Sequence, residues 1–410
     1  MPQHSSQPPA GLRDARAAAA EVARLLALKS VKKLLAWIGG HEAEITAFQM
    51  TVTAIPAPTG AEARRAAFLA ERFKALGWQV EADAVGNQLL CPQPPRPGEP
   101  LIAMSAHMDT VFGPGVPIEL HEEYATIHGP GISDNGAGLA ALWAVAAALS
   151  ATGLQTELPL LLVANVCEEG EGNLRGIRHL FESSPYGESI SSLLAVDGSG
   201  SESIIAQALG SRRFEVVFHG PGGHSWIDFG APNPVMAMAR AIDLLGRIEL
   251  PATPKTALTV SVVAAGTSIN AIPETAAMKI DTRSEDEAQL DRLEELLQAA
   301  VDEAMRTAGE GLHCTIQPLG SRPAGNLRRE APILLATEAA SRHLGLATHL
   351  ERASTDANIP ISLGIDALAI GTGGNGGGAH TIHEWYSPEG RTEGLQRILL
   401  ILLALAGVRE

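Results

Sequence analysis

Cysteines and long apolar runs are scarce in this 410-residue sequence. Three cysteines, Cys91, Cys167 and Cys314, lie far apart and form no CxxC pair. An odd number of separated cysteines is a poor disulfide framework, which favours a reducing compartment. The longest apolar run, 398–406, is much shorter than the roughly 20 residues that a membrane-spanning helix needs. We therefore expect a buried C-terminal helix.

An excess of basic charge is also lacking, since 30 Lys and Arg residues stand against 46 Asp and Glu residues. The net charge is −16, which argues against nucleic acid and anionic membranes as partners. Residues 1–10 are polar and proline-rich, and no apolar segment with a cleavage site follows them. We therefore expect a cytoplasmic protein without a secretory signal. Aromatic residues make up only 4% of the chain, so the core must be built from Ala, Leu, Val and Ile.

The length and the order of apolar segments predict two domains of different design. A chain of 410 residues exceeds one ordinary hydrophobic core. Apolar strands alternate with helical segments in the first part, which predicts an α/β fold with a mostly parallel sheet covered by helices. Residues 210–320 instead follow a β-α-β-β-α-β order, which is typical of a ferredoxin-like α+β unit. We expect 1–209 and 321–410 to form the first domain, with 210–320 inserted as a second.

Polar, ionisable residues follow the apolar strands of the first domain. Ligands of such sheets bind at the carboxyl ends of the strands, so we expect these side chains to share one crevice. They are His107, Asp109, Asp134, Glu168, Glu169, Asp197 and His380. Imidazole and carboxylate ligands suit Zn, and also Mn or Co. The set exceeds what one tetrahedral zinc needs, whereas two ions that share a carboxylate would use it fully.

Each of these residues has an ordinary alternative when it is taken alone. His107 and Asp109 could be a hydrogen-bonded surface pair, and Asp134 could begin a turn or cap a helix. Adjacent glutamates are most often solvated, and Asp197 before a glycine could belong to a simple turn. Acids gathered without a partner would repel one another, and cations remove that cost. The joint pattern therefore favours a metal site.

Seven segments, in order, resemble the M20 family of metallopeptidases. They are SAHMDTV, GPGISDNGAGLAAL, CEEGEGNLRG, VDGSG, GPGGHS, GTSINAIPETAAMKIDTR and AHTIHE. The resemblance extends from about Ile55 to the C-terminus. It implies a catalytic domain of the two-zinc exopeptidase type, which holds two divalent ions, and an inserted lid domain that makes a homodimer.

The resemblance also implies a role for each residue at the metal site. His107 and Asp197 would bind one ion, Glu169 and His380 the other, and Asp134 would bridge them. Asp109 would orient His107 from behind. Glu168 would be the general base that accepts a proton from the metal-bound water and passes it to the leaving nitrogen.

Further residues are implied for substrate binding. His224 follows the flexible GPGG turn and would reach the active site of the partner subunit, unless it is a loop histidine without a role. Asn270 and Arg283 would contact substrate, with Arg283 facing a carboxylate. A structural salt bridge remains the alternative for Arg283. Asp356 would lie near the substrate or cap a loop.

Three functions fit these residues. The first is an exopeptidase that cuts short peptides near the N-terminus, similar to the aminotripeptidase branch. The second is an N-acyl-amino-acid amidohydrolase or a carboxypeptidase of the same family. The third is a non-catalytic binding protein, which the presence of every ligand and of Glu168 disfavours. The resemblance favours the first, because Asp197 stands where the deacylase and carboxypeptidase branches have glutamate.

Overall fold

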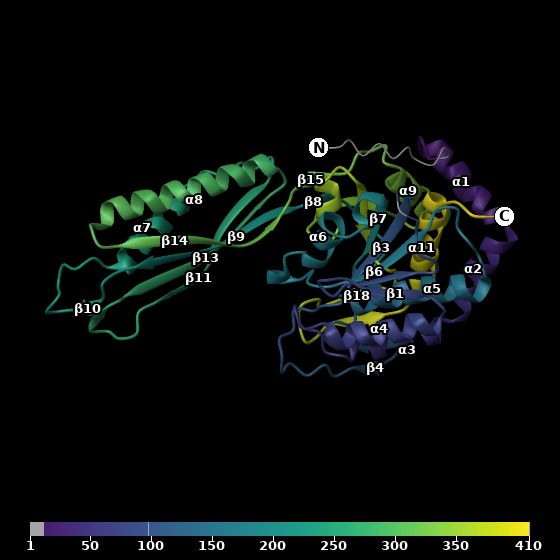
Figure 1. Cartoon of the computed structure of the whole chain (residues 1–410), viewed down its shortest axis with the longest axis horizontal. Helices are drawn as coiled ribbons and strands as arrows, with labels where there is room; N and C mark the ends of the chain where they lie inside the picture. Colours follow the sequence, from purple (N-terminus) through teal and green to yellow (C-terminus); the bar gives the residue numbers. More distant parts are fainter. Residues whose placement is uncertain (1–11, 97, 410) are drawn as a thin grey trace. The chain divides into compact units, whose positions relative to one another are not determined.

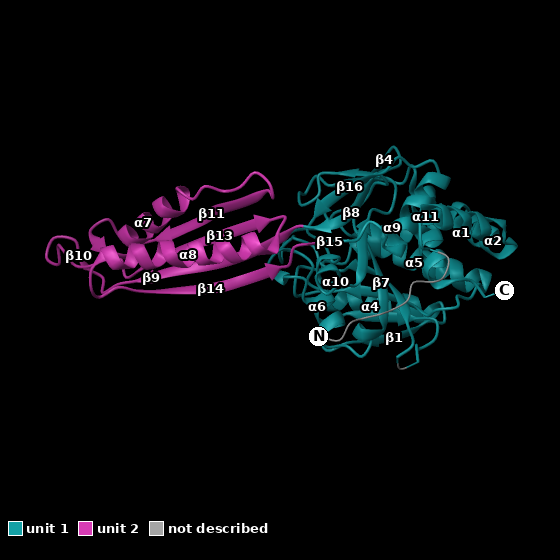
Figure 2. Ribbon diagram, turned by 90° about the horizontal axis from the view of Figure 1, so that it is seen from above, with its two compact units in different colours: residues 1–208, 326–410 teal, residues 209–325 magenta. Residues whose placement is uncertain are grey.

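The computed structural model describes residues 12–96 and 98–409, which fall into two compact units. The first unit runs to Ala208 and resumes at Asn326, and the second is Leu209–Gly325 (Figure 2). The second unit extends beyond the C-terminal end of the predicted insertion, 210–320, because the last long strand of the unit continues to Arg322.

A mixed, largely parallel sheet forms the centre of the first unit (Figure 1). The strand order is β1–β2–β6–β3–β7–β17–β8–β15, and β16 pairs with β8. The strands are β1 (Gln79–Ala82), β2 (Gln88–Cys91), β3 (Leu101–His107), β6 (Leu160–Asn165), β7 (Ile190–Val196), β8 (Ser203–Ala208), β15 (Gly325–Asn326), β16 (His349–Ala353) and β17 (Asp366–Ile370). The central strands β6, β3, β7 and β17 are parallel, as predicted.

Helices cover both faces of this sheet. Successive residues of β3 alternate between two hydrophobic clusters, so that Ile102 and Met104 belong to one and Leu101 and Ala103 to the other. This two-sided burial explains why the strands are continuous apolar runs. The helices are α1 (Ala15–Ala27), α2 (Lys29–Gly40), α3 (Glu42–Thr53), α4 (Ala63–Ala75), α5 (Gly136–Thr152), α6 (Arg175–Glu182), α9 (Pro332–His343), α10 (Asn358–Ser362) and α11 (Arg391–Ala406).

The C-terminal apolar run lies within α11 and is buried in the larger cluster, as predicted. Within the described residues, no helix is both long enough and apolar enough to cross a membrane.

The second unit contains a four-stranded antiparallel sheet with two helices on one face. The strands are β9 (Gly210–His219), β11 (Thr256–Ala265), β13 (Thr275–Ser284) and β14 (His313–Arg322), in the order β11–β13–β9–β14. Helices α7 (Pro234–Gly246) and α8 (Glu287–Ala308) pack on alternate residues of β9 and β13. The chain order β9-α7-β11-β13-α8-β14 is that of a ferredoxin-like unit. Two short strands, β10 (Gly223–His224) and β12 (Ala271–Ile272), pair within the connecting loops.

A small antiparallel sheet in the first unit holds the glycine-rich segment that follows β17. Its order is β18 (Asn375–Gly377), β19 (Trp385–Ser387), β5 (Thr126–His128) and β4 (His121–Glu123). The chain between β18 and β19 carries His380. The pairing of β19 with β5 brings this segment beside the residues that lead into α5.

Candidate metal centre

Three adjacent parallel strands deliver most of the predicted ligands. β3 ends at His107, β6 ends shortly before Glu168 and Glu169, and β7 ends one residue before Asp197. Since β6, β3 and β7 are neighbours, their carboxyl ends meet at one edge of the sheet.

Asp134 and His380 reach the same place by another route. Asp134 precedes α5, and His380 lies between two strands of the small sheet. The prediction that every one of these residues follows a strand of the main sheet is therefore wrong for this pair. His380 has φ of 65°, in the left-handed region where residues other than glycine are uncommon.

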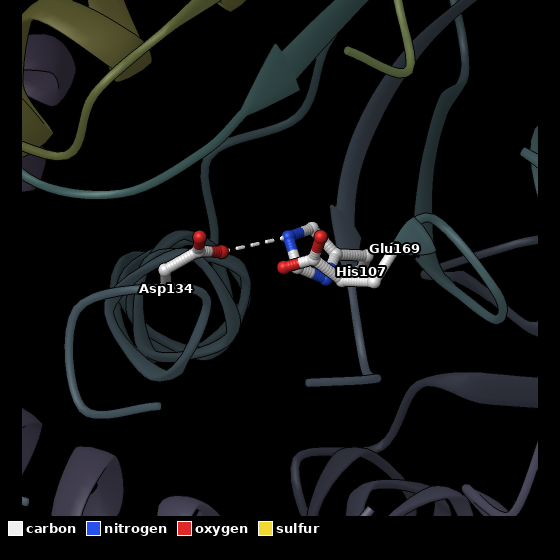
Figure 3. Close-up of side chains that lie close together, drawn as sticks. All are labelled: His107, Asp134 and Glu169. Carbon is white, nitrogen blue, oxygen red and sulfur yellow. Dashed lines mark ion pairs between the residues drawn. The ribbon is translucent and has the colours of Figure 1, made fainter. Parts of the chain in front are cut away.

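Asp134 lies between the two histidines. His107 Nε2 is 3.1 Å from Asp134 Oδ1 and 3.5 Å from Asp197 Oδ1. His380 Nε2 is 3.1 Å from Asp134 Oδ2 and 3.2 Å from Glu169 Oε1. The two oxygens of one carboxylate thus face two separate imidazoles, each of which also faces a second carboxylate. Figure 3 shows His107, Asp134 and Glu169 converging, with the contact between His107 and Asp134 dashed.

The residues fit a bound cation. Ligand atoms of His107, Asp134 and Glu169 all lie within 4.8 Å of one another. Asp134 Oδ1 is buried and accepts no hydrogen bond, although it lies 3.1 Å from His107 Nε2. A buried, unsatisfied carboxylate oxygen is costly, and a metal ion satisfies it. Nitrogen and oxygen ligands of this kind suit zinc and neighbouring first-row ions.

The electrostatics of the cluster also favour positive charge. Contacts with Asp134 and Glu169 raise the pKa of His380 to about 10, although burial opposes this shift. Burial alone would raise the pKa of Asp134, but its interactions with His107 and His380 lower it well below the usual range. The Asp134 carboxylate therefore stays ionised and attracts cations.

Asp109 supports both sides of this cluster. Its carboxylate accepts hydrogen bonds from the backbone amides of Glu168 and Glu169, each at 2.9 Å. The carboxylate is 3.5 Å from His107 Nδ1, whereas the backbone oxygen of Asp109 is only 3.0 Å from that nitrogen. Burial would raise the pKa of Asp109, but the contacts with His107 and the two amides outweigh it and lower the pKa. Asp109 thus fixes the Glu168–Glu169 turn as well as the imidazole.

Two buried charged residues near the N-terminus of α4 hold the backbone just before Asp109 and just before Glu168. They were not predicted from the sequence. Arg65 donates to the backbone oxygens of Met108 at 2.6 Å and of Thr53 at 3.0 Å. Glu62 accepts a hydrogen bond from the backbone amide of Cys167 at 3.1 Å. Cys167 has φ of 57°, so this bond helps to hold a strained backbone immediately before Glu168. In the sequence both residues read as the polar face of an amphipathic helix.

Asp356 is buried rather than facing an open crevice. Only 4% of the residue is exposed, and its carboxylate accepts a hydrogen bond from Asn165 Nδ2 at 3.0 Å. Burial raises its pKa to about 7. A contact with substrate stays a prediction for this residue.

The second unit places its predicted residues in two groups. His224 in β10 pairs with Ala271, and the backbone oxygen of Asn270 accepts a hydrogen bond from Ser225 at 3.0 Å, so the two predicted residues lie in adjacent loops. Arg283 lies near the far end of β13 and forms an ion pair with Asp281 at 2.8 Å. The ten-residue strand β13 separates the groups by roughly 25 Å, from a rise of about 3.4 Å per residue.

Residues 103–404 match the family model "Peptidase family M20/M25/M40". The chain belongs to this family. It is a hydrolytic enzyme of the peptidase and amidohydrolase type, and the enzymes of its family depend on metal ions. The family assignment agrees with the resemblance that the seven sequence segments carry.

Curated relatives are matched over only part of their length. The chain is 27% identical over 263 residues to a probable carboxypeptidase of Aspergillus clavatus, which covers 58% of this chain and 57% of that protein. It is 32% identical over 137 residues to the uncharacterised protein YgeY of Escherichia coli, covering 32% of this chain and 33% of that one. The matched regions therefore span about half of the first relative and a third of the second.

Solved structures share the fold over most of the M20 chain. Aminopeptidase PepT from Bacillus cereus has a TM-score of 0.71 at 18% identity, covering 89% of this chain and 99% of that one. A tripeptidase from Staphylococcus aureus has a TM-score of 0.73 at 20% identity, with 89% and 98% covered. The dipeptidase Dug1p from Saccharomyces cerevisiae has a TM-score of 0.71 at 14% identity, with 93% and 99% covered. Identities this low establish the fold and leave the substrate open.

Proposed function

We propose that this M20 enzyme is a metal-dependent exopeptidase that cuts short peptides near the N-terminus, with Glu168 as the general base. The observation that carries the hydrolytic part is the position of Asp134 between His107 and His380, with Asp197 and Glu169 completing the two sides. This arrangement matches two ion sites that share one carboxylate.

His107 and Asp197 would hold one ion, His380 and Glu169 the other, and Asp134 both. Zinc is the ion that this ligand set suits best, with cobalt or manganese as substitutes. When bound, such ions polarise a scissile carbonyl and make a water acidic near neutral pH.

We assign Glu168 the proton transfer and leave the ligand role to its neighbour Glu169. It is buried, and its backbone amide is held by Asp109 at 2.9 Å, next to the ligand Glu169. Its carboxylate takes a proton from the attacking water while the water oxygen bonds to the scissile carbon. It then delivers that proton to the leaving nitrogen as the C–N bond breaks. Glu168 ends the cycle in its starting state.

The first prediction concerns the number of ions. Metal-free wild-type protein titrated with zinc should bind about two ions per chain, since two-metal sites place their ions roughly 3.5–4 Å apart around a shared ligand. His380→Ala should bind about one, because Asp134, His107 and Asp197 remain for the other site. Elemental analysis after desalting gives the count.

The matched control for this titration is His383→Ala. His383 is an exposed histidine three residues from His380, and its loss should leave the ion count unchanged. A wild-type protein that is fully active with one tightly bound ion would contradict the shared site.

Two observations favour action near the N-terminus of a peptide. Asp197, rather than glutamate, stands at the non-bridging position, which resembles the aminopeptidase and dipeptidase branches of the family. The structures that share the fold include proteins named aminopeptidase PepT and tripeptidase. The second candidate is a carboxypeptidase or an N-acyl-amino-acid amidohydrolase, and the name of the A. clavatus relative, probable carboxypeptidase, supports it.

Blocked substrates separate these candidates. N-acetylation of di- and tripeptides should abolish their cleavage, because an aminopeptidase must recognise a free amine. C-terminal amidation should weaken cleavage without abolishing it, since it removes only the carboxylate that Arg283 would face. Product release is followed by mass spectrometry across matched free, acetylated and amidated peptides and a set of N-acyl amino acids. Cleavage that needs a free carboxylate but tolerates acetylation would identify a carboxypeptidase, and cleavage of N-acyl amino acids alone would identify an amidohydrolase.

We further infer that the second unit is a lid that makes a homodimer. Its loops carry four strongly exposed apolar side chains, Trp226, Ile227, Phe229 and Ile269. Exposed apolar side chains do not stabilise a monomer in water, but they stabilise a dimer when the interface buries them. His224 in the same loops would serve the active site of the partner subunit. The three cysteines are unpaired, which supports a reducing, cytoplasmic location.

A further inference from the structure

Glu384 lies completely buried beside the metal centre, four residues after His380. Its side chain accepts three hydrogen bonds from backbone amides. Oε2 accepts from Gly131 at 2.7 Å, and Oε1 accepts from Ser133 at 2.8 Å and from Asp134 at 2.7 Å. The Glu384 carboxylate therefore holds the backbone of Asp134, which faces both histidines. It also holds the backbones of Gly131 and Ser133, just before Asp134 in the chain.

The main chain of Glu384 is tied to the same loop. Its backbone oxygen accepts a hydrogen bond from the amide of Gly129 at 2.8 Å. The next two residues, Trp385 and Tyr386, pair with β5 just before that glycine. The segment that carries His380 and the loop that carries Asp134 are thus joined by both backbone and side-chain contacts.

A glutamate in this position is costly for the fold unless it is well paired. Burial raises the pKa of Glu384 to about 7, and the three amide hydrogen bonds oppose that rise. An apolar side chain would fill the same space without this desolvation cost. Its three bonds, however, all go to the short loop that ends at Asp134. This concentration on one loop indicates a role in its geometry.

We propose that Glu384 is a positioning residue. It fixes the Asp134 carboxylate at the distance from His380 that is required by two ion sites sharing this carboxylate. The inference rests on the proposed two-ion function, because Asp134 is the bridging ligand there. Residues that support metal ligands in this way typically change metal affinity about 10–100-fold when they are replaced.

Glu384→Gln tests this role without a change of size. A glutamine has one acceptor oxygen and presents an NH₂ group to at least one of the three amides, so at least one hydrogen bond is lost. In the metal-free protein, hydrogen–deuterium exchange across residues 129–136 should accelerate roughly 10-fold, the effect of losing one bond to a charged acceptor. Zinc affinity, measured by competition with a chelating dye, should fall about 10–100-fold.

The matched control is Glu389→Gln, which makes the same charge change at an exposed residue of the same segment. Its exchange and zinc affinity should equal those of wild type. Glu384→Asp keeps the charge but is one methylene shorter, and it should shift both quantities in the same direction by a smaller factor. If the glutamine variant does not fold, the aspartate variant carries both measurements.

Each outcome bears on a separate claim. Unchanged exchange at 129–136 in a folded Glu384 variant would show that the Glu384 hydrogen bonds do not hold this loop, and would overturn the proposal. Faster exchange with unchanged zinc affinity would limit Glu384 to loop stability and overturn its role in ligand positioning. Failure of the wild-type protein to bind two ions would instead overturn the two-ion function. The exchange measurement would still show whether Glu384 holds the loop at 129–136.

Discussion

Replacing Glu168 with glutamine is expected to lower kcat by roughly 10²–10⁴-fold, the usual contribution of a positioned acid–base group. Glutamine has nearly the same size but cannot accept the proton of the attacking water. The backbone amide of residue 168 keeps its hydrogen bond to Asp109, and Glu169 remains in place as a ligand. Fold and metal content should therefore be those of wild type. Steady-state kinetics on the best peptide from the substrate panel, with elemental analysis of the same sample, measures both.

Glu171→Gln is the control for this substitution. Glu171 lies three residues along the same segment and is exposed, so its replacement should change kcat less than about twofold. If Glu168→Gln turns over within a few-fold of wild type, another residue handles the proton and the assignment of Glu168 is wrong.

The sequence predicts the part of the site that local patterns encode. Continuous apolar runs ending in His107, Glu168 and Asp197 identify buried parallel strands, and neighbouring parallel strands end at the same edge of a sheet. The order of elements in 210–320 likewise predicts the ferredoxin-like unit, because each helix and strand there has its own clear periodicity.

The remaining part depends on contacts between distant segments. Asp134 reaches the site at the start of α5, and His380 reaches it through the pairing of β19 with β5. Glu384 and Asp134 lie 250 residues apart, so no local pattern relates them. Arg65 is similar, since its partners are backbone oxygens, which every residue type possesses and no sequence pattern can mark.

The lid residues have a spatial relation that the sequence did not predict. His224 and Arg283 lie near opposite ends of β13, roughly 25 Å apart at about 3.4 Å per residue. An extended tripeptide spans only about 10 Å. The separation of these two backbone positions is more than twice the length of such a peptide. If both residues act on one short substrate, this distance favours their coming from two different chains.

Complementation between two inactive variants tests this trans arrangement. His224→Ala is expected to keep the dimer and both ions but to lose most turnover, because each active site lacks the partner's imidazole. Glu168→Gln is inactive for lack of the base. In a mixed dimer, one active site has an intact Glu168 together with a His224 from the partner, and the other site has neither. A fully mixed dimer should therefore recover up to about half of the wild-type activity, by counting sites about a two-fold axis.

The experiment mixes differently tagged variants under conditions of subunit exchange and purifies the heterodimer through both tags before assay. His313→Ala, an exposed histidine of the same unit, is the control that should be active by itself. If His224 acts within its own chain, every site of the mixed dimer lacks one group, and mixing restores nothing. An inactive, doubly tagged heterodimer would therefore refute the trans arrangement. A purely monomeric wild-type protein with full activity would refute it too, because no partner would be present to supply the histidine.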